Sequence, residues 1–105
     1  MPIPDLMAGW QRFRAGRFRD QRVLFERIAR EGQRPRTAMV ACCDSRVDPA
    51  IVFDCDPGDL FVVRNVANLV PPYEESGSYH GTSAALEYAV GVLGVRDIVV
   101  LGHSQ

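Results

Sequence analysis

A cysteine, an aspartate and an arginine occupy alternate positions near the middle of the sequence, as Cys42, Asp44 and Arg46. A cysteine thiolate is both a zinc ligand and a nucleophile, so either chemistry is open to Cys42. A carboxylate that is paired with an arginine stays ionised and fixed in orientation. The pair Asp44–Arg46 is therefore either a structural salt bridge or an acceptor that orients a water molecule at a metal.

A histidine, His103, follows Cys42 by 61 residues. A thiolate and an imidazole that converge suit zinc, but the spacing alone equally allows two unrelated loop residues. Because side chains alternate along a strand, Cys42 and its neighbour Cys43 cannot face the same way. Only Cys42 is in register with Asp44 and Arg46. We therefore expect Cys42 to be the ligand and Cys43 to be a small buried spacer.

Three short apolar runs are expected to position these residues as buried strands: Thr37–Cys42, Leu60–Val63 and Ile98–Gly102. Helical patterns lie between them, and continuous apolar strands that alternate with helices favour a parallel sheet in an α/β domain. In such sheets, functional sites gather at the carboxyl ends of the strands. That rule selects three places: residues 42–46, residues 64–65 and His103.

The helical patterns have recognisable start and stop signals. Residues 4–31 predict two helical pieces that are broken at Gly16 and ended by Gly32. Asp48 and the proline after it predict a capped short helix through residue 53. A further helix is expected over 83–93, capped by Thr82 or Ser83, and residues 68–80 are expected to form a loop.

Composition indicates one small globular domain, with 105 residues of which 47% are hydrophobic and 24% charged. No apolar run approaches the roughly 20 residues that a membrane helix needs. The N-terminus lacks the pattern of a secretory signal, so a cytoplasmic location is expected. An odd number of cysteines, three, argues against a disulfide scaffold.

Charge is distributed unevenly along the chain. Residues 1–36 hold nine arginines against four acids, whereas residues 37–105 hold three arginines against nine acids. A basic segment can mark contact with nucleic acid. Here the arginines alternate with apolar residues along a helical pattern, which favours a solvated or subunit-facing helix. We therefore expect neither a nucleic-acid partner nor a membrane.

The motif Cys-x-Asp-x-Arg at 42–46, together with Gly-His-Ser at 102–104, resembles the β-class carbonic anhydrases. The segments "PGDLFVVRNVANLVPPY" and "ALEYAVGVLGVRDIVVLGHS" extend the resemblance over nearly all of the chain after residue 35. It implies a single domain of that fold over 1–105, with an N-terminal helical arm over 1–35 and an α/β core over 36–105. Zinc, held by Cys42 and His103, is the implied cofactor.

The resemblance also implies a role for further residues. Asp44 and Arg46 would form a catalytic dyad at the metal, and Asp44 would itself bind zinc only in a closed form. In plant-like members a substrate pocket is built partly across a dimer interface, which implies a homodimer or a higher even oligomer. Its residues correspond here to Gln33, Phe61, Val66 and Tyr88. All four residue types are present, which favours the plant-like subgroup, with zinc open to water.

One expected zinc ligand is missing from the sequence. The family pattern continues Gly-His-Ser-x-Cys-Gly, and this chain ends at Gln105, where that cysteine would follow. A catalytic zinc normally has three protein ligands and one open position. The chain is therefore expected to be the N-terminal portion of a longer enzyme.

The expected activity is the reversible hydration of carbon dioxide to bicarbonate and a proton, which makes the enzyme a carbonate dehydratase, a zinc lyase. Two alternatives stay open at this point. One is a carbonic-anhydrase-like interaction module without catalysis, and the other is an enzyme that hydrolyses carbon disulfide.

Overall fold

The computed structural model describes residues 1–73 and 80–105. The chain divides into two compact units, an N-terminal arm, Met1–Gly32, and a core unit, Gln33–Gln105. Each unit is described here by itself. The segment 74–79, which belongs to the expected loop over 68–80, lies outside the described residues.

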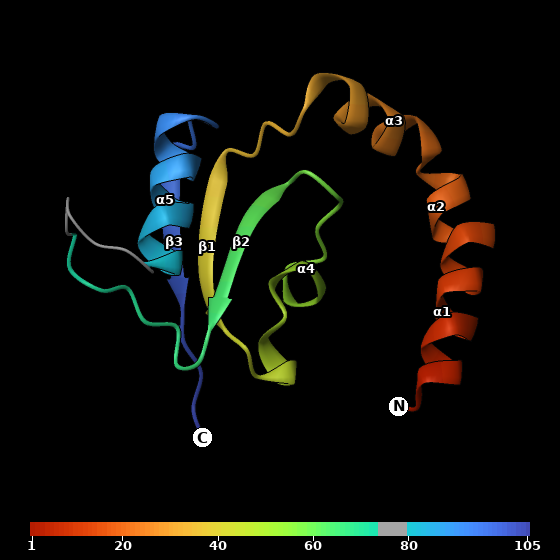
Figure 1. The fold of residues 1–105 in the computed structure, drawn as a ribbon, viewed down its shortest axis with the longest axis horizontal. Coiled ribbons are helices and arrows are strands. Elements are labelled where there is room, and N and C mark those ends of the chain that lie inside the picture. The colour runs from red at the N-terminus through yellow and green to blue at the C-terminus, as the bar shows by residue number, and fades with distance from the viewer. Residues whose placement is uncertain (74–79) are drawn as a thin grey trace. The chain divides into compact units, whose positions relative to one another are not determined.

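The core unit is built on three parallel strands, β1 (Thr37–Cys42), β2 (Leu60–Asn65) and β3 (Asp97–Leu101), in the order β2-β1-β3 (Figure 1). Cys42 pairs with Asn65 of β2. The pairing of β1 with β3 ends one residue earlier, at Ala41 and Leu101. The expected α/β fold with a parallel sheet is confirmed. β1 has the expected bounds, whereas β2 runs two residues further and β3 is shifted back by one.

Burial differs strongly among the strands, and only β1 meets the expectation of a buried strand. Its residues from Ala38 to Cys42 are all buried, because β1 has a hydrogen-bonded neighbour on each side. β2 is mostly half-buried, and four of the five residues of β3 are exposed. The expectation was wrong for β3 because an apolar sequence does not reveal whether a strand is central or lies at the edge of the described sheet.

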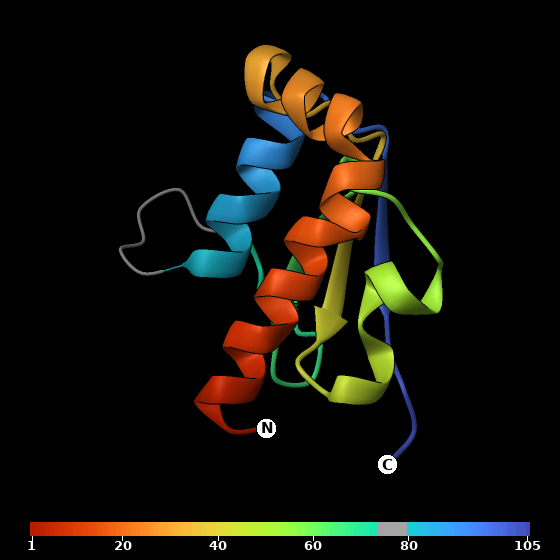
Figure 2. The same cartoon turned by 90° about the vertical axis from the view of Figure 1, so that its right-hand side faces the viewer.

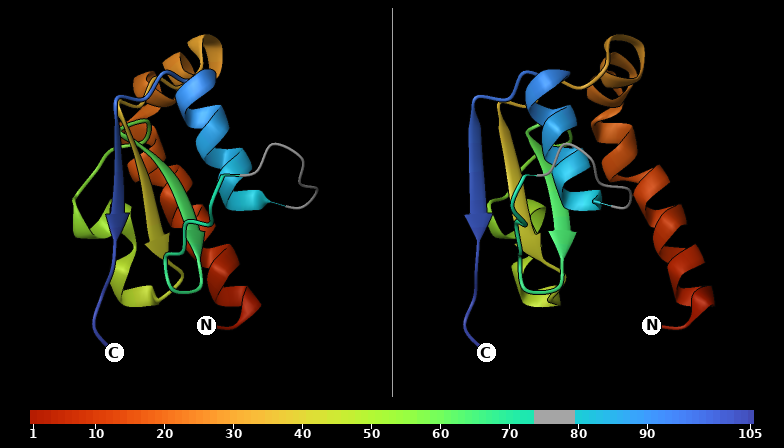
Figure 3. Two further views of the ribbon diagram at one scale, coloured as in Figure 1. Left: turned by 90° about the vertical axis from the view of Figure 1, so that its left-hand side faces the viewer. Right: turned by 60° about the vertical axis from the view of Figure 1, so that its left-hand side comes forward.

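Helices α4 (Pro49–Val52) and α5 (Gly81–Gly91) lie on opposite sides of the sheet (Figure 3). Asp48 caps α4 as expected, with its carboxylate accepting from the amide of Ala50 at 3.2 Å. The expected cap of α5 was wrong: its N-cap is His80, which makes no side-chain cap. The hydroxyl of Thr82 instead accepts a hydrogen bond from the side chain of Asn65 at 3.0 Å.

The arm contains three helices, α1 (Ile3–Ala15), α2 (Arg17–Asp20) and α3 (Arg22–Glu31), and α3 leaves the line of the first two (Figure 2). Gly16 breaks the run as expected, and a second break at Gln21 was not foreseen. Four aromatic rings hold the arm together through centroid distances between 5.2 and 5.9 Å: Trp10, Phe13, Phe18 and Phe25. Across the described parts of the chain, no helix combines the length and apolarity needed to cross a bilayer.

Candidate metal centre

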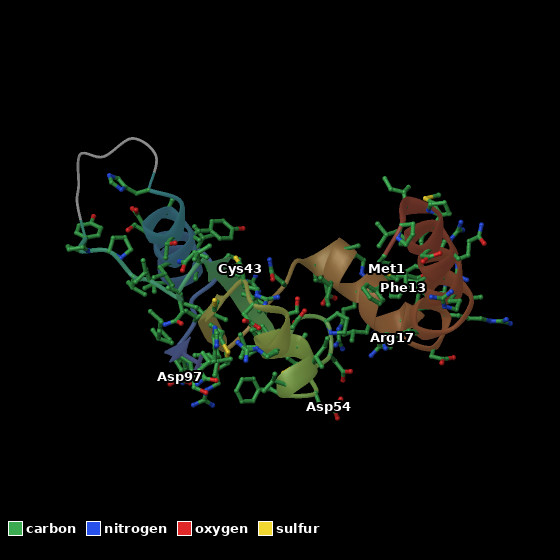
Figure 4. The ribbon with its side chains drawn as sticks, turned by 90° about the horizontal axis from the view of Figure 1, so that it is seen from below. Met1, Phe13, Arg17, Cys43, Asp54 and Asp97 are labelled. Carbon is green, nitrogen blue, oxygen red and sulfur yellow. The ribbon has the colours of Figure 1, made fainter. Side chains whose placement is uncertain are left out.

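The two candidate metal donors lie at the carboxyl end of adjacent strands. Cys42 is the last residue of the central strand and is 8% exposed. His103 follows β3 by two residues, and its side chain is 21% exposed. Figure 4 views the sheet from this end, with Cys43, the residue after Cys42, labelled. The strand-end rule therefore brings together two residues that are 61 positions apart in the sequence.

The His103 imidazole and the Cys42 thiol change each other's pKa. Their side-chain interaction is the main reason why the pKa of Cys42 falls to about 7, and backbone groups of Asp44 and Ala67 lower this pKa further. The same interaction raises the pKa of His103, helped by the Ser104 carbonyl 3.1 Å from Nδ1. Both donors therefore face one point, and the thiolate form of Cys42 is available near neutral pH.

Asp44 and Arg46 form a two-pronged ion pair. Arg46 Nε donates to Asp44 Oδ1 at 3.0 Å, and Arg46 Nη2 donates to Asp44 Oδ2 at 2.9 Å. The Arg46 amide also donates to Asp44 Oδ1, at 2.8 Å. These bonds hold the pKa of Asp44 well below its usual range, and the Asp44 carboxylate in turn raises the pKa of Arg46. Asp44 is therefore an anion whose orientation is fixed.

The geometry behind this ion pair is not the one expected from strand alternation. β1 ends at Cys42, and a single 3₁₀ turn, η1 (Ser45–Val47), follows after two residues. Asp44 caps that turn, so a turn and not a strand brings Arg46 back onto the carboxylate. The expectation for Cys43 as a buried residue was also wrong, because its side chain is exposed.

The donor set suits zinc in its chemistry but is incomplete in number. Sulfur and imidazole nitrogen are the ligand types that zinc prefers. Asp44 Oδ2 lies 4.0 Å from His103 Nε2, close enough to act on a species held by the donors. Residues 1–73 and 80–105 contain no group of three acidic, cysteine or histidine side chains able to hold a metal ion. The described site therefore offers two candidate donors and one adjacent anion.

Two of the expected pocket residues, Phe61 and Tyr88, lie away from these donors within one chain, whereas Val66 follows the residue that pairs with Cys42. Phe61 and Tyr88 pack against each other with ring centroids 6.0 Å apart. Phe61 pairs with Ala38 near the start of β1, four residues and thus about 13 Å before the strand end. Val66 is 78% exposed at the end of β2, and the side chain of Gln33 makes no hydrogen bond to another described residue.

A comparison with known protein families shows to which family the chain belongs. Residues 37–105, well over half of the sequence, match the family described as carbonic anhydrase. The chain belongs to the β-carbonic anhydrase family.

Two curated carbonic anhydrases illustrate this membership. The protein from Synechocystis sp. is 46% identical over 100 residues, which cover 95% of this chain and 35% of the relative. The protein from Pseudomonas aeruginosa is 45% identical over 101 residues, which cover 96% of this chain and 44% of the relative. The chain therefore spans less than half the length of these carbonic anhydrases.

Solved structures agree with the family and with its β class. The β-carbonic anhydrase CcaA superimposes with a TM-score of 0.88 at 44% identity, over 98% of this chain and 45% of that chain. A β-carbonic anhydrase from Sordaria macrospora, one of two described as tetrameric, gives a TM-score of 0.83 at 32% identity, over 97% of this chain and 49% of that chain. The architecture of both units thus has counterparts in β-carbonic anhydrases.

Two polar residues at the site, Arg64 and Asn65, received no role from the sequence. Asn65 Oδ1 accepts from the Leu69 amide at 2.7 Å, and its Nδ2 donates to the Leu69 carbonyl at 2.8 Å. Asn65 therefore holds the loop that carries Val66 and Ala67. Their position at the end of the second strand was the only indication in the sequence. The strand-end rule selects this position but does not predict which groups the two side chains bind.

The lowered pKa of Cys42 predicts an unusually reactive thiol. In metal-free protein with Cys43 and Cys55 replaced by serine, alkylation of Cys42 by iodoacetamide is expected to reach half its maximal rate near pH 7. His103→Asn removes the main interaction that favours the thiolate, so the midpoint should rise toward the ordinary value of about 8.5. The measurement is the alkylation rate from pH 5 to 10.

The chain's other histidine supplies the control for this titration. His80→Asn should leave the midpoint of Cys42 unchanged, because His80 is not among the groups that shift its pKa. Equal midpoints in the His103→Asn variant and the parent protein would contradict the proposed contact between the two donors.

Proposed function

We propose that this chain is part of a zinc-dependent carbonic anhydrase, a lyase that interconverts carbon dioxide and bicarbonate. The observation that carries the proposal is the meeting of Cys42, His103 and the ionised Asp44 at one end of the sheet. Membership of the carbonic anhydrase family supports it, through residues 37–105. The balanced reaction consumes one water and one carbon dioxide and yields one bicarbonate and one proton.

Cys42 and His103 are the proposed zinc ligands. Their sulfur and nitrogen donors already face each other, and the thiolate that a metal requires is favoured by its surroundings. When bound, zinc would supply the Lewis acidity that lets a water molecule lose a proton near neutral pH. We propose that the third protein donor comes from sequence that follows Gln105, since the relatives are much longer than this chain.

Asp44 is the proposed acceptor that orients the attacking water. Because its pKa is held low by Arg46, Asp44 cannot hold a proton at neutral pH and can only accept a hydrogen bond. This restriction leaves a lone pair of the water free to face carbon dioxide. Arg46 contributes by fixing both carboxylate oxygens through Nε and Nη2.

We propose that the substrate lies in a pocket that two copies of the chain complete as a homodimer or a higher even oligomer, as in the plant-like subgroup. Phe61, Val66 and Tyr88 would form its apolar wall, and Gln33 would donate to a substrate oxygen where charge develops. The separation of Phe61 from the donor end of its own sheet supports a pocket between copies. Tyr88, 46% exposed, is available to a second copy. A reducing compartment such as the cytoplasm fits three free cysteines.

A second candidate function is a carbonic-anhydrase-like interaction module without catalysis. One observation favours it: no set of three metal-binding side chains exists among residues 1–73 and 80–105. Such a module would keep the fold and the Asp44–Arg46 pair without turning over substrate.

Zinc content and activity in two forms of the protein separate these functions. A form that continues past Gln105 to the length of the relatives should hold about one zinc per chain, the content of a closed ligand set, and hydrate carbon dioxide in stopped-flow assays. The present chain should bind zinc weakly, because it supplies only two candidate ligands. Zinc in the longer form without hydration would favour the interaction module, and zinc in neither form would defeat the metalloenzyme proposal.

A further inference from the structure

We propose that Arg64 is a positioning residue that fixes the backbone of residues 42–44 and thereby aims the Cys42 sulfur and the Asp44 carboxylate at His103. The role in catalysis rests on the proposed carbonic anhydrase function, whereas the role in aiming the donors stands on geometry alone. The hydrogen bonds of Arg64 to Cys42 and Asp44 both go to carbonyl groups, so it acts on these residues through the backbone.

The guanidinium of Arg64 binds two carbonyl groups of residues 42–44. Its Nε donates to the Cys42 carbonyl at 2.8 Å, and its Nη2 donates to the Asp44 carbonyl at 2.8 Å. These two carbonyls belong to a proposed zinc ligand and to the proposed water acceptor. The planar fork of an arginine can bind both at once, which the single ammonium of a lysine cannot do in a fixed geometry.

The backbone of β2 completes this hold on the segment. The Cys43 amide donates to the Asn65 carbonyl at 2.9 Å, which continues the strand pairing one residue past the end of β1. One backbone group of each of three successive residues is thus held by two consecutive residues of β2: the Cys42 carbonyl, the Cys43 amide and the Asp44 carbonyl. A segment at the end of a strand that is fixed at each of three successive residues has little freedom to redirect its side chains.

Arg64 is itself held in place by an ion pair with Asp48, on the side of the sheet that α4 covers. Its Nη1 lies 3.4 Å from Asp48 Oδ2, and Asp48 is the residue that caps α4. The side chain of Arg64 is only 26% exposed, so this ion pair is partly shielded from solvent. Since neighbours on a strand point to opposite faces, Arg64 is directed toward α4, while Asn65 reaches Thr82 of α5 (Figure 3).

Two arginines therefore position Asp44. Arg46 binds the carboxylate and fixes its ionisation and its orientation, whereas Arg64 binds the carbonyl of Asp44 and fixes the position of its backbone. Removing Arg64 would leave the Asp44–Arg46 pair intact but free to move as a unit relative to His103. The site would keep its groups and lose their alignment.

Arg64→Gln tests the proposal in the form that continues past Gln105. Loss of the forked guanidinium should lower the affinity of the site for Co²⁺, added as a probe in place of zinc, by about 10- to 100-fold. This is the usual cost of removing a group that orients a metal ligand. In the metal-free protein, the amides of Cys43 and Arg46 should exchange hydrogen faster, while the amide of Val40 in the central strand keeps its protection. Arg36→Gln is the matched control, because it removes an exposed arginine paired with Asp97 at the opposite end of the sheet.

Wild-type cobalt affinity and unchanged exchange in Arg64→Gln would overturn the proposal. If Arg64→Gln fails to fold, Arg64→Lys decides, because lysine keeps the charge facing Asp48 but not the fork. A folded Arg64→Lys protein with weakened cobalt binding supports positioning, and full affinity in that variant overturns it. Cobalt binding without hydration by the parent protein would count against the proposed function alone. If the parent binds no cobalt, the exchange of Cys43 and Arg46 still tests the role of Arg64.

Discussion

In the form that continues past Gln105, replacing Asp44 with asparagine is expected to lower carbon dioxide hydration by about 100- to 1,000-fold, the range that one preorganised hydrogen-bonding group contributes, while zinc content stays the same. The asparagine has nearly the same shape, but its amide nitrogen can donate where the carboxylate only accepts. The water would then no longer be restricted to one orientation. The two-pronged pair with Arg46 would lose one acceptor, since both carboxylate oxygens accept from that guanidinium.

Stopped-flow hydration and zinc analysis of the same preparation check this expectation. Asp97→Asn is the matched control, because Asp97 is also paired with an arginine, Arg36 at 3.3 Å, but lies at the other end of the sheet. That variant should hydrate carbon dioxide normally. Normal turnover by a folded, zinc-containing Asp44→Asn protein would remove Asp44 from the mechanism.

In the form that continues past Gln105, replacing Cys42 with serine is expected to abolish zinc binding and to reduce hydration to the background rate. A serine hydroxyl is not deprotonated near neutral pH and lacks the soft sulfur donor that zinc prefers. The adjacent Cys43→Ser variant makes the same chemical change one position away, on an exposed side chain. It should keep both zinc and activity.

The contrast between the two cysteines is the decisive measurement. Zinc content by atomic emission and hydration by stopped flow should separate Cys42→Ser from Cys43→Ser completely, with circular dichroism confirming that both fold. Zinc retained in Cys42→Ser, or lost in Cys43→Ser, would show that the ligand has been assigned to the wrong residue.

The sequence predicted the fold well where local signals and the final structure agree. The strand Thr37–Cys42 was correct at both ends, and its continuous apolar run becomes the buried centre of the sheet. The helix breaks at Gly16 and the cap by Asp48 were also correct. Burial of β3 was not predictable, because it depends on which elements cover a strand rather than on the strand's own residues.

The candidate site was predictable in its members more than in its geometry. The strand-end rule placed Cys42 and His103 together without any contact information. The rule of alternation failed for Arg46, because Arg46 lies in a 3₁₀ turn beyond the end of β1. The contacts of Arg64 were beyond prediction, because a long, flexible guanidinium can reach many acceptors and only the folded backbone selects two carbonyls.

The exposed strand β3 has a consequence for how copies of this chain meet. Ile98, Val99 and Val100 are 49%, 39% and 52% exposed, so apolar side chains are uncovered on both faces of one strand. β1 is the only strand that pairs with it among the described residues, which leaves a row of backbone groups open along its other side. Such a strand is a template for adding a strand from another molecule.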